Sequence, residues 1–108
     1  MKNNNEVQEL SENEFGLFTK NGTVLIDFFA EWCMPCVMLS PVIEEIQEKF
    51  KGKLKVGKVN IEDNPELAEN FGVSSIPNLI IFKEGNVVEQ IIGSMPQEEI
   101  ESVIKGYI

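Results

Sequence analysis

The sequence contains no histidine and only two cysteines among its 108 residues. Because a tetrahedral zinc site usually takes four Cys or His ligands, a single chain cannot close such a site. A chain of this length buries roughly 60% or more of its unfolded surface, so it can form a core without a structural metal or disulfide. We expect one domain over residues 1–108, with residues 1–6 loose.

Positive charge is also scarce, because nine Lys and Arg stand against 18 Asp and Glu, for a formal net charge of -9. Such a surface repels nucleic-acid phosphates and anionic lipids, so we expect neither nucleic acid nor a membrane as a partner. No apolar run approaches the roughly 20 residues of a membrane helix. The polar start, residues 1–6, lacks the apolar core of a secretory signal, which favours a cytoplasmic protein.

Apolar periodicity and turn signals predict the order β-α-β-α-β-α-β-β-α. Strand 24–30 is apolar at both parities apart from Asp27, which is typical of a strand buried on both faces. We therefore expect an α/β fold of three layers, in which about four helices flank a mixed, mostly parallel sheet of about five strands. The predicted elements are strand 7–10, helix 11–18, strand 24–30, helix 33–49, strand 54–61, helix 64–71, strands 78–83 and 87–92, and helix 94–107.

Two helix starts carry capping signals. Ser11 with Glu14, and Ser94 with Gln97, fit the capping box that begins a helix. In helix 33–49 the apolar side chains recur close to helical spacing, which is typical of a helix with one apolar face. These side chains are Val37, Met38, Val42, Ile43, Ile46 and Phe50.

Cys33 and Cys36 lie where a buried strand gives way to a helix. Unpaired N–H groups and the helix dipole at that end favour a thiolate on Cys33, and the thiolate is the attacking species in disulfide exchange. Cys36 lies one turn further and can resolve a mixed disulfide. Two less favoured alternatives are a metal shared between two chains and a structural disulfide, which would close almost no loop.

Two of the charged residues in the predicted strands, Asp27 and Lys58, are candidates for a functional role. A carboxylate buried at Asp27 is costly unless it is paired or protonated, which favours a functional role over a structural one. Lys58 shares strand parity with Leu54 and Val56, so it should point inward; the alternative is a surface lysine with a buried stem.

With these residues in place, the sequence resembles the thioredoxin family from about residue 7 to residue 108. The matches come in the right order along the chain and are more specific than the two cysteines alone. They are Asp27–Cys36, Lys58–Glu62, Ile76–Gly85 and Gly93.

The resemblance implies a thioredoxin fold and a reductase of protein disulfides that cycles between the Cys33/Cys36 dithiol and disulfide. It implies that Asp27 is a general base for Cys36, acting through water, and that Lys58 pairs with Asp27. It also implies a cis Ile76–Pro77 bond, in a loop that faces the cysteines and pairs with an extended substrate. The rim around Cys33 would consist of Trp32, Met34, Pro35, Ile76, Pro77 and Gly93.

The expected partners are disulfide-containing proteins and a thioredoxin reductase, which would supply electrons to a monomer that binds no cofactor. Met34 departs from the glycine most common in the family, and Val37 from the frequent Lys or Arg, which leaves the reduction potential open. The alternatives are a glutaredoxin-like, oxidising or isomerising enzyme of the same fold, or a binding module that uses the apolar rim.

Overall fold

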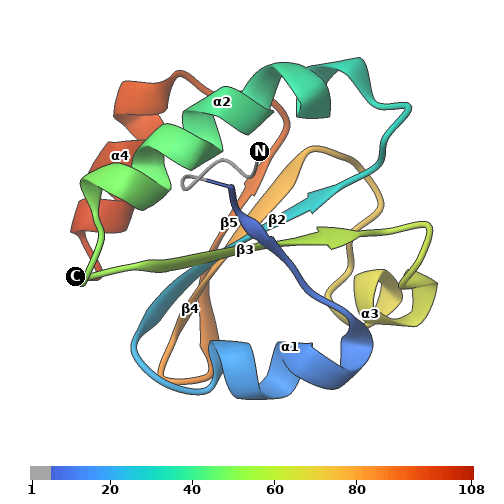
Figure 1. Cartoon of the computed structure of the whole chain (residues 1–108), viewed down its shortest axis with the longest axis horizontal. Coiled ribbons are helices and arrows are strands. Elements are labelled where there is room, and N and C mark those ends of the chain that lie inside the picture. The colour runs from blue at the N-terminus through green and yellow to red at the C-terminus, as the bar shows by residue number, and fades with distance from the viewer. Residues whose placement is uncertain (1–5) are drawn as a thin grey trace.

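A five-stranded sheet forms the middle layer of the computed structural model, which describes residues 6–108 (Figure 1). The strand order is β1-β3-β2-β4-β5. The first three strands are mutually parallel, while β4 is antiparallel to both β2 and β5. The strands are β1 (Gln8–Glu9), β2 (Thr23–Phe29), β3 (Lys55–Asn60), β4 (Asn78–Lys83) and β5 (Asn86–Ile92).

Helices cover both faces of this sheet. Buried side chains of α2 and α4 pack in one core cluster, and those of α1 and α3 pack in the other. Figure 1 shows these two pairs on opposite sides of the strands. The mixed sheet and its flanking helices confirm the predicted fold; the prediction for residues 1–5 lies outside the described residues. The helices are α1 (Glu12–Thr19), α2 (Met34–Lys49), α3 (Pro65–Asn70) and α4 (Gln97–Lys105).

Strand β2 is buried at every position except its last residue, the half-buried Phe29, because both of its faces meet a helical layer. Leu25 belongs to the cluster beneath α2 and α4, whereas Val24 and Ile26 belong to the cluster beneath α1 and α3. Since successive side chains of a strand alternate between faces, Asp27 lies on the side of Leu25 and faces α2. The strand thus places one carboxylate in an apolar layer beside the helix that carries the cysteines.

The two predicted capping boxes had different outcomes. Glu14 accepts hydrogen bonds from the backbone N–H and the hydroxyl of Ser11, at 2.8 and 3.0 Å, so the first box is confirmed. The second was wrong, because α4 begins at Gln97 with Pro96 as its N-cap. A proline pushes the residue before it out of the helical region, so the turn after Ser94 cannot be helical.

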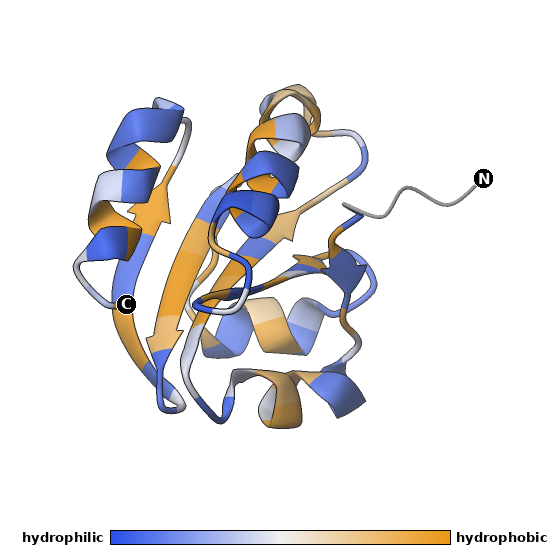
Figure 2. Ribbon diagram, turned by 60° about the vertical axis from the view of Figure 1, so that its left-hand side comes forward, coloured by the Kyte–Doolittle hydropathy of each residue, from blue (hydrophilic) through white to orange (hydrophobic). Residues whose placement is uncertain are grey.

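The buried face of α2 differs from the prediction. Ile43 and Ile46 are buried as expected, but Val37 and Met38 are 51% and 72% exposed. Hydropathy colouring shows apolar segments in the strands and polar turns along the outer faces of the helices (Figure 2). Within residues 6–108, no helix is both long enough and apolar enough to cross a bilayer.

Candidate active site

The two cysteines occupy the first turn of α2. Cys33 is its N-cap residue, and its sulfur accepts a hydrogen bond from the backbone N–H of Cys36 at 3.2 Å. A disulfide joins the pair, with their Cα atoms 5.2 Å apart. When the bond is reduced, the same N–H and the helix dipole favour negative charge on the sulfur of Cys33.

Both cysteines are almost fully buried, at 4% exposure each. They form a small apolar cluster with Ala30, against which Ile76 packs. The side chains on either side of Cys33 behave differently, because Trp32 and Met34 are each 66% exposed. The sulfur atoms therefore lie just beneath a protruding apolar surface.

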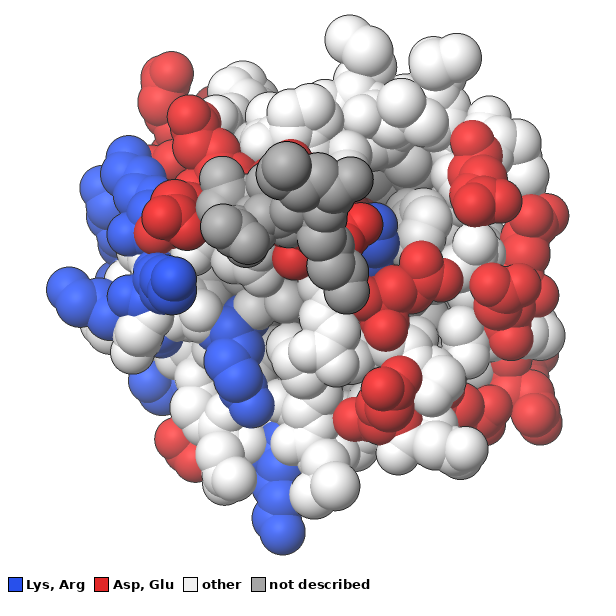
Figure 3. Space-filling view, in the orientation of Figure 1, with Lys and Arg blue, Asp and Glu red and all other residues white. Residues whose placement is uncertain are grey.

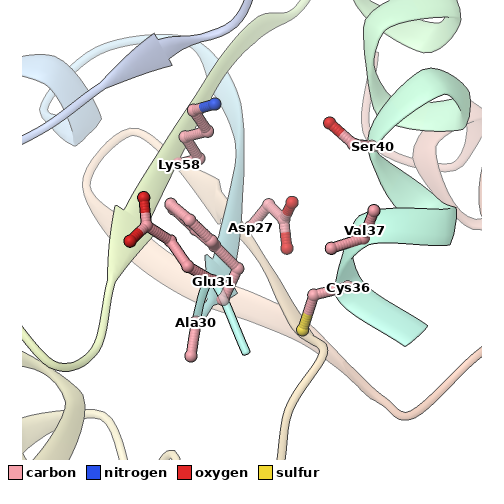
Figure 4. A pocket seen from close by; sticks show the side chains of 8 residues that line it. Asp27, Ala30, Glu31, Cys36, Val37, Ser40 and Lys58 are labelled. Atoms are coloured by element: carbon pink, nitrogen blue, oxygen red, sulfur yellow. The ribbon is translucent and has the colours of Figure 1, made fainter. Parts of the chain in front are cut away.

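Behind Cys36 lies a pocket of about 210 Å³ between α2 and the sheet. Figure 4 shows Asp27, Lys58 and Cys36 projecting around it from β2, β3 and α2, respectively. A pocket of this size is roomy enough for water. Its lining residues are Asp27, Phe29, Ala30, Glu31, Cys36, Val37, Ser40 and Lys58.

Asp27 is the buried acid of this pocket, with 5% of its surface exposed. Its Oδ1 atom has no hydrogen-bond partner among the described residues. Burial raises the pKa of Asp27 to about 7, and the positive charge of Lys58 opposes that rise. A carboxyl group with this pKa can take up and release a proton near neutral pH, as a general base must.

Lys58 is the register partner of Asp27 on the neighbouring parallel strand. It is half-buried and lines the same pocket, so its side chain lies on the predicted side of β3. Its Nζ atom lies 5.4 Å from the centroid of the Phe29 ring. Lys58 thus acts on Asp27 as a nearby charge; that this pairing serves the reaction stays a prediction.

The loop before β4 approaches the cysteines from another part of the chain. The Ile76–Pro77 peptide bond is cis, as predicted. Ile76 packs against the cysteine cluster, and the carbonyl of Pro77 accepts a hydrogen bond from the N–H of Gly93 at 2.9 Å. The loop before β4 and the loop after β5 therefore meet near the cysteines. That these residues bind substrate stays a prediction.

Sequence reasoning missed three features of this region. Ser40 and Glu31 line the pocket, and Met38 extends the exposed apolar surface beyond Met34. Spacing offered a signal for Ser40 alone, since residues four apart share a helix face and Ser40 follows Cys36 by four.

The residues around Cys33 and Cys36 do not form a group of metal ligands. Within residues 6–108, no three His, Cys, Asp or Glu side chains gather as a metal ion would require. What they build is a cysteine pair at a helix N-terminus, backed by a buried acid with a pKa near neutrality. Fold and site together define a thiol–disulfide oxidoreductase.

Comparison with known proteins narrows this class to one family. The family model for thioredoxin matches residues 6–106. The thioredoxin of Listeria monocytogenes is 49% identical over 94% of this chain and 99% of its own length. That of Chlamydia caviae is 47% identical over 94% of this chain and 98% of its own length. The chain belongs to the thioredoxin family.

A solved structure agrees with this assignment. The N21Q mutant thioredoxin from Halobacterium salinarum superposes with a TM-score of 0.88, at 32% sequence identity. The match covers 99% of this chain and 95% of the other. The Cys33–Cys36 pair is therefore the redox pair of a protein-disulfide oxidoreductase.

Proposed function

We propose that the protein works in the reducing direction, taking disulfides from other proteins onto the Cys33–Cys36 pair. The match to the thioredoxin family supports this direction. The order of attack follows from the position of Cys33 as N-cap of α2, with its sulfur 3.2 Å from the backbone nitrogen of Cys36. That N–H stabilises the Cys33 thiolate, which makes Cys33 the attacking residue.

In the first step, the Cys33 thiolate attacks one sulfur of the substrate disulfide. The substrate S–S bond breaks, its second sulfur leaves as a thiolate and takes up a proton, and a mixed disulfide links Cys33 to the substrate. Cys36 stays reduced beneath the surface.

In the second step, Asp27 accepts the proton of Cys36 through water in the pocket. The Cys36 thiolate then attacks the sulfur of Cys33, and the substrate sulfur departs with the electron pair and a proton. The products are the reduced substrate and the Cys33–Cys36 disulfide. A separate enzyme, a thioredoxin reductase, returns two electrons, because the sequence carries neither of the cofactor-binding motifs GxGxxG and the P-loop.

The apolar surface around Cys33 suits protein substrates. The rim of residues around Cys33 binds an extended substrate segment, whose backbone pairs with the loop at the cis proline. Figure 3 shows an uncharged area at the upper edge of the molecule, over the first turns of α2. The protein would act as a monomer in the cytoplasm, where such a reductant is needed. The rim consists of Trp32, Met34, Pro35, Ile76, Pro77 and Gly93.

The reduction potential of the Cys33–Cys36 pair tests the direction of the reaction. Trp32 is the single tryptophan and adjoins Cys33, so its fluorescence should follow the redox state in dithiol buffers. We expect a potential below the glutathione poise of about −220 to −260 mV. A potential well above that range would favour an oxidising or isomerising enzyme instead.

Single-cysteine variants test the order of the two steps. Cys33→Ser should abolish reduction of a protein disulfide, whereas Cys36→Ser should still form the mixed disulfide but not release it. A Cys33→Ser variant that reduced disulfides at the normal rate would contradict the mechanism.

A further inference from the structure

Ser40 lies in the wall of the pocket behind Cys36. It follows Cys36 by one turn of α2, so both residues share the helix face that looks toward the sheet. Ser40 is half-buried, and Figure 4 shows its hydroxyl directed from α2 toward the side of the pocket that holds Asp27 and Lys58. The hydroxyl has no hydrogen-bond partner among the described residues.

Few polar groups face Asp27. Lys58 comes from β3, Glu31 from the turn before α2, and Cys36 and Ser40 from α2 itself. On the other side of β2, the register partner of Asp27 is the apolar Leu79 of β4. Ser40 is therefore the neutral hydroxyl among these groups, and it can both donate and accept a hydrogen bond.

The unpaired oxygen of Asp27 and the unpaired hydroxyl of Ser40 line one pocket large enough for water. A water molecule with two or more polar partners is the usual occupant of such a polar space. We propose that Ser40 is a positioning residue that holds this water against Asp27 and, through it, donates a hydrogen bond to the ionised carboxylate. The ionised form is the one that accepts the proton of Cys36.

This inference rests on the proposed role of Asp27 and adds to it. Ser40 exchanges no electrons and forms no covalent bond. The proton of Cys36 passes to Asp27 by way of the water, and the Cys36 thiolate then attacks Cys33 as described above. Because hydrogen bonds to a charged form favour that form, loss of the hydroxyl should raise the pKa of Asp27.

The test separates the two thiol steps with 5,5′-dithiobis(2-nitrobenzoate). Attack by Cys33 releases the first coloured thiolate at a rate that depends on reagent concentration. Attack by Cys36 releases the second in a first-order phase. We expect Ser40→Ala to slow only this second phase at pH 7, roughly three- to tenfold, and to move its pH midpoint upward.

Two variants serve as matched controls. Ser40→Thr keeps the hydroxyl and should restore most of the rate, while Ser102→Ala makes the same change on an exposed face of α4 and should alter neither phase. The pKa of Asp27, followed by carbon NMR of its carboxyl group, should rise in Ser40→Ala alone. A merely structural role for Ser40 would leave that pKa in place.

Asp27→Asn distinguishes failure of this inference from failure of the proposed function. If Asp27→Asn slows the second phase and Ser40→Ala does not, the role of Ser40 is overturned while that of Asp27 stands. If Asp27→Asn leaves the phase unchanged, both roles fall. In the Asp27→Asn background, Ser40→Ala should have no further effect; an undiminished effect there would overturn action through Asp27.

Discussion

Asp27 and Lys58 are register partners on adjacent parallel strands, yet Oδ1 of Asp27 has no hydrogen-bond partner within residues 6–108. Lys58 instead places its ammonium group 5.4 Å from the centroid of the Phe29 ring. Its charge lowers the pKa of Asp27, but burial outweighs it and leaves that pKa at about 7. The chain thus keeps, beside the reacting thiols, a carboxyl group that is half-protonated at about pH 7.

Burial of Asp27 should cost folding stability at high pH. Its folded pKa of about 7 lies above the ordinary value of 3.8, so the folded state favours the protonated form. The stability due to this preference is full below pH 4 and is lost as pH rises toward 7. Asp27→Asn should therefore match the parent near pH 4 and exceed it at pH 8, by up to the order of 4 kcal/mol.

Urea unfolding at the two pH values measures this difference. Asp63→Asn, which changes an exposed aspartate, is the control and should show no such divergence. Equal stabilities of Asp27→Asn and the parent at pH 8 would show that the buried carboxyl carries no ionisation cost.

Removing the charge of Lys58 should raise the pKa of Asp27 further. Lys58→Met keeps the apolar stem and removes the positive charge that opposes the effect of burial. The pH midpoint of the Cys36 step should move upward with that pKa, and carbon NMR of the carboxyl group would follow the titration directly. Lys55→Met is the control, because Lys55 lies on the other face of the same strand. An unchanged or lower pKa in Lys58→Met would rule out the coupling.

Local sequence patterns sufficed for the features that depend on one segment. The apolar run around Asp27 indicated a doubly buried strand, and parity placed Lys58 on the face of Val56, as observed. Cys33 and Cys36 were recognisable from spacing and position. In each of these cases the period of a strand or the start of a helix determines where the side chain points.

Features that depend on contacts between segments were not predictable in this way. Residues 32–43 include no charged side chain, so hydropathy alone does not fix which face of α2 is buried. Two of the apolar side chains at helical spacing, Val37 and Met38, lie outside the buried face. The 2.7 Å ion pair from Lys49 of α2 to the buried Glu101 of α4 joins residues 52 apart. No periodicity encodes such a contact.

Gly57 lies where β3 leaves little room for a side chain. A Cβ atom at this position would lie 2.8 Å from Cδ1 of Leu10 and 3.0 Å from Cε1 of Phe18. Gly57→Ala should therefore destabilise the fold by about 1–3 kcal/mol, because the buried Leu10 and the half-buried Phe18 would have to shift. Chemical denaturation measures the loss.

The matched control for that change is Gly16→Ala. Gly16 lies within α1 and has no atom within 4 Å of its would-be Cβ, so alanine there should stabilise the helix by about 0.5–1 kcal/mol. If both changes shifted stability in the same direction, the close approach at Gly57 would not be the cause.

The exposed apolar face of α2 should matter for protein substrates and not for small ones. Met38 is 72% exposed on the turn after the cysteines, and Leu17 is 77% exposed on α1, on the other side of the sheet. Met38→Glu should lower kcat/KM for reduction of insulin about five- to tenfold, because a charge would replace a side chain that a protein substrate covers. Reduction of 5,5′-dithiobis(2-nitrobenzoate) should stay unchanged.

Leu17→Glu separates this local effect from a change in net charge, since both variants add one negative charge to an exposed apolar position. It should leave both activities at the parent level. An equal loss in the two variants would mean that net charge alone governs encounter with the substrate. A loss confined to Met38→Glu, and to the protein substrate, would mean that docking reaches along α2 past the cysteines.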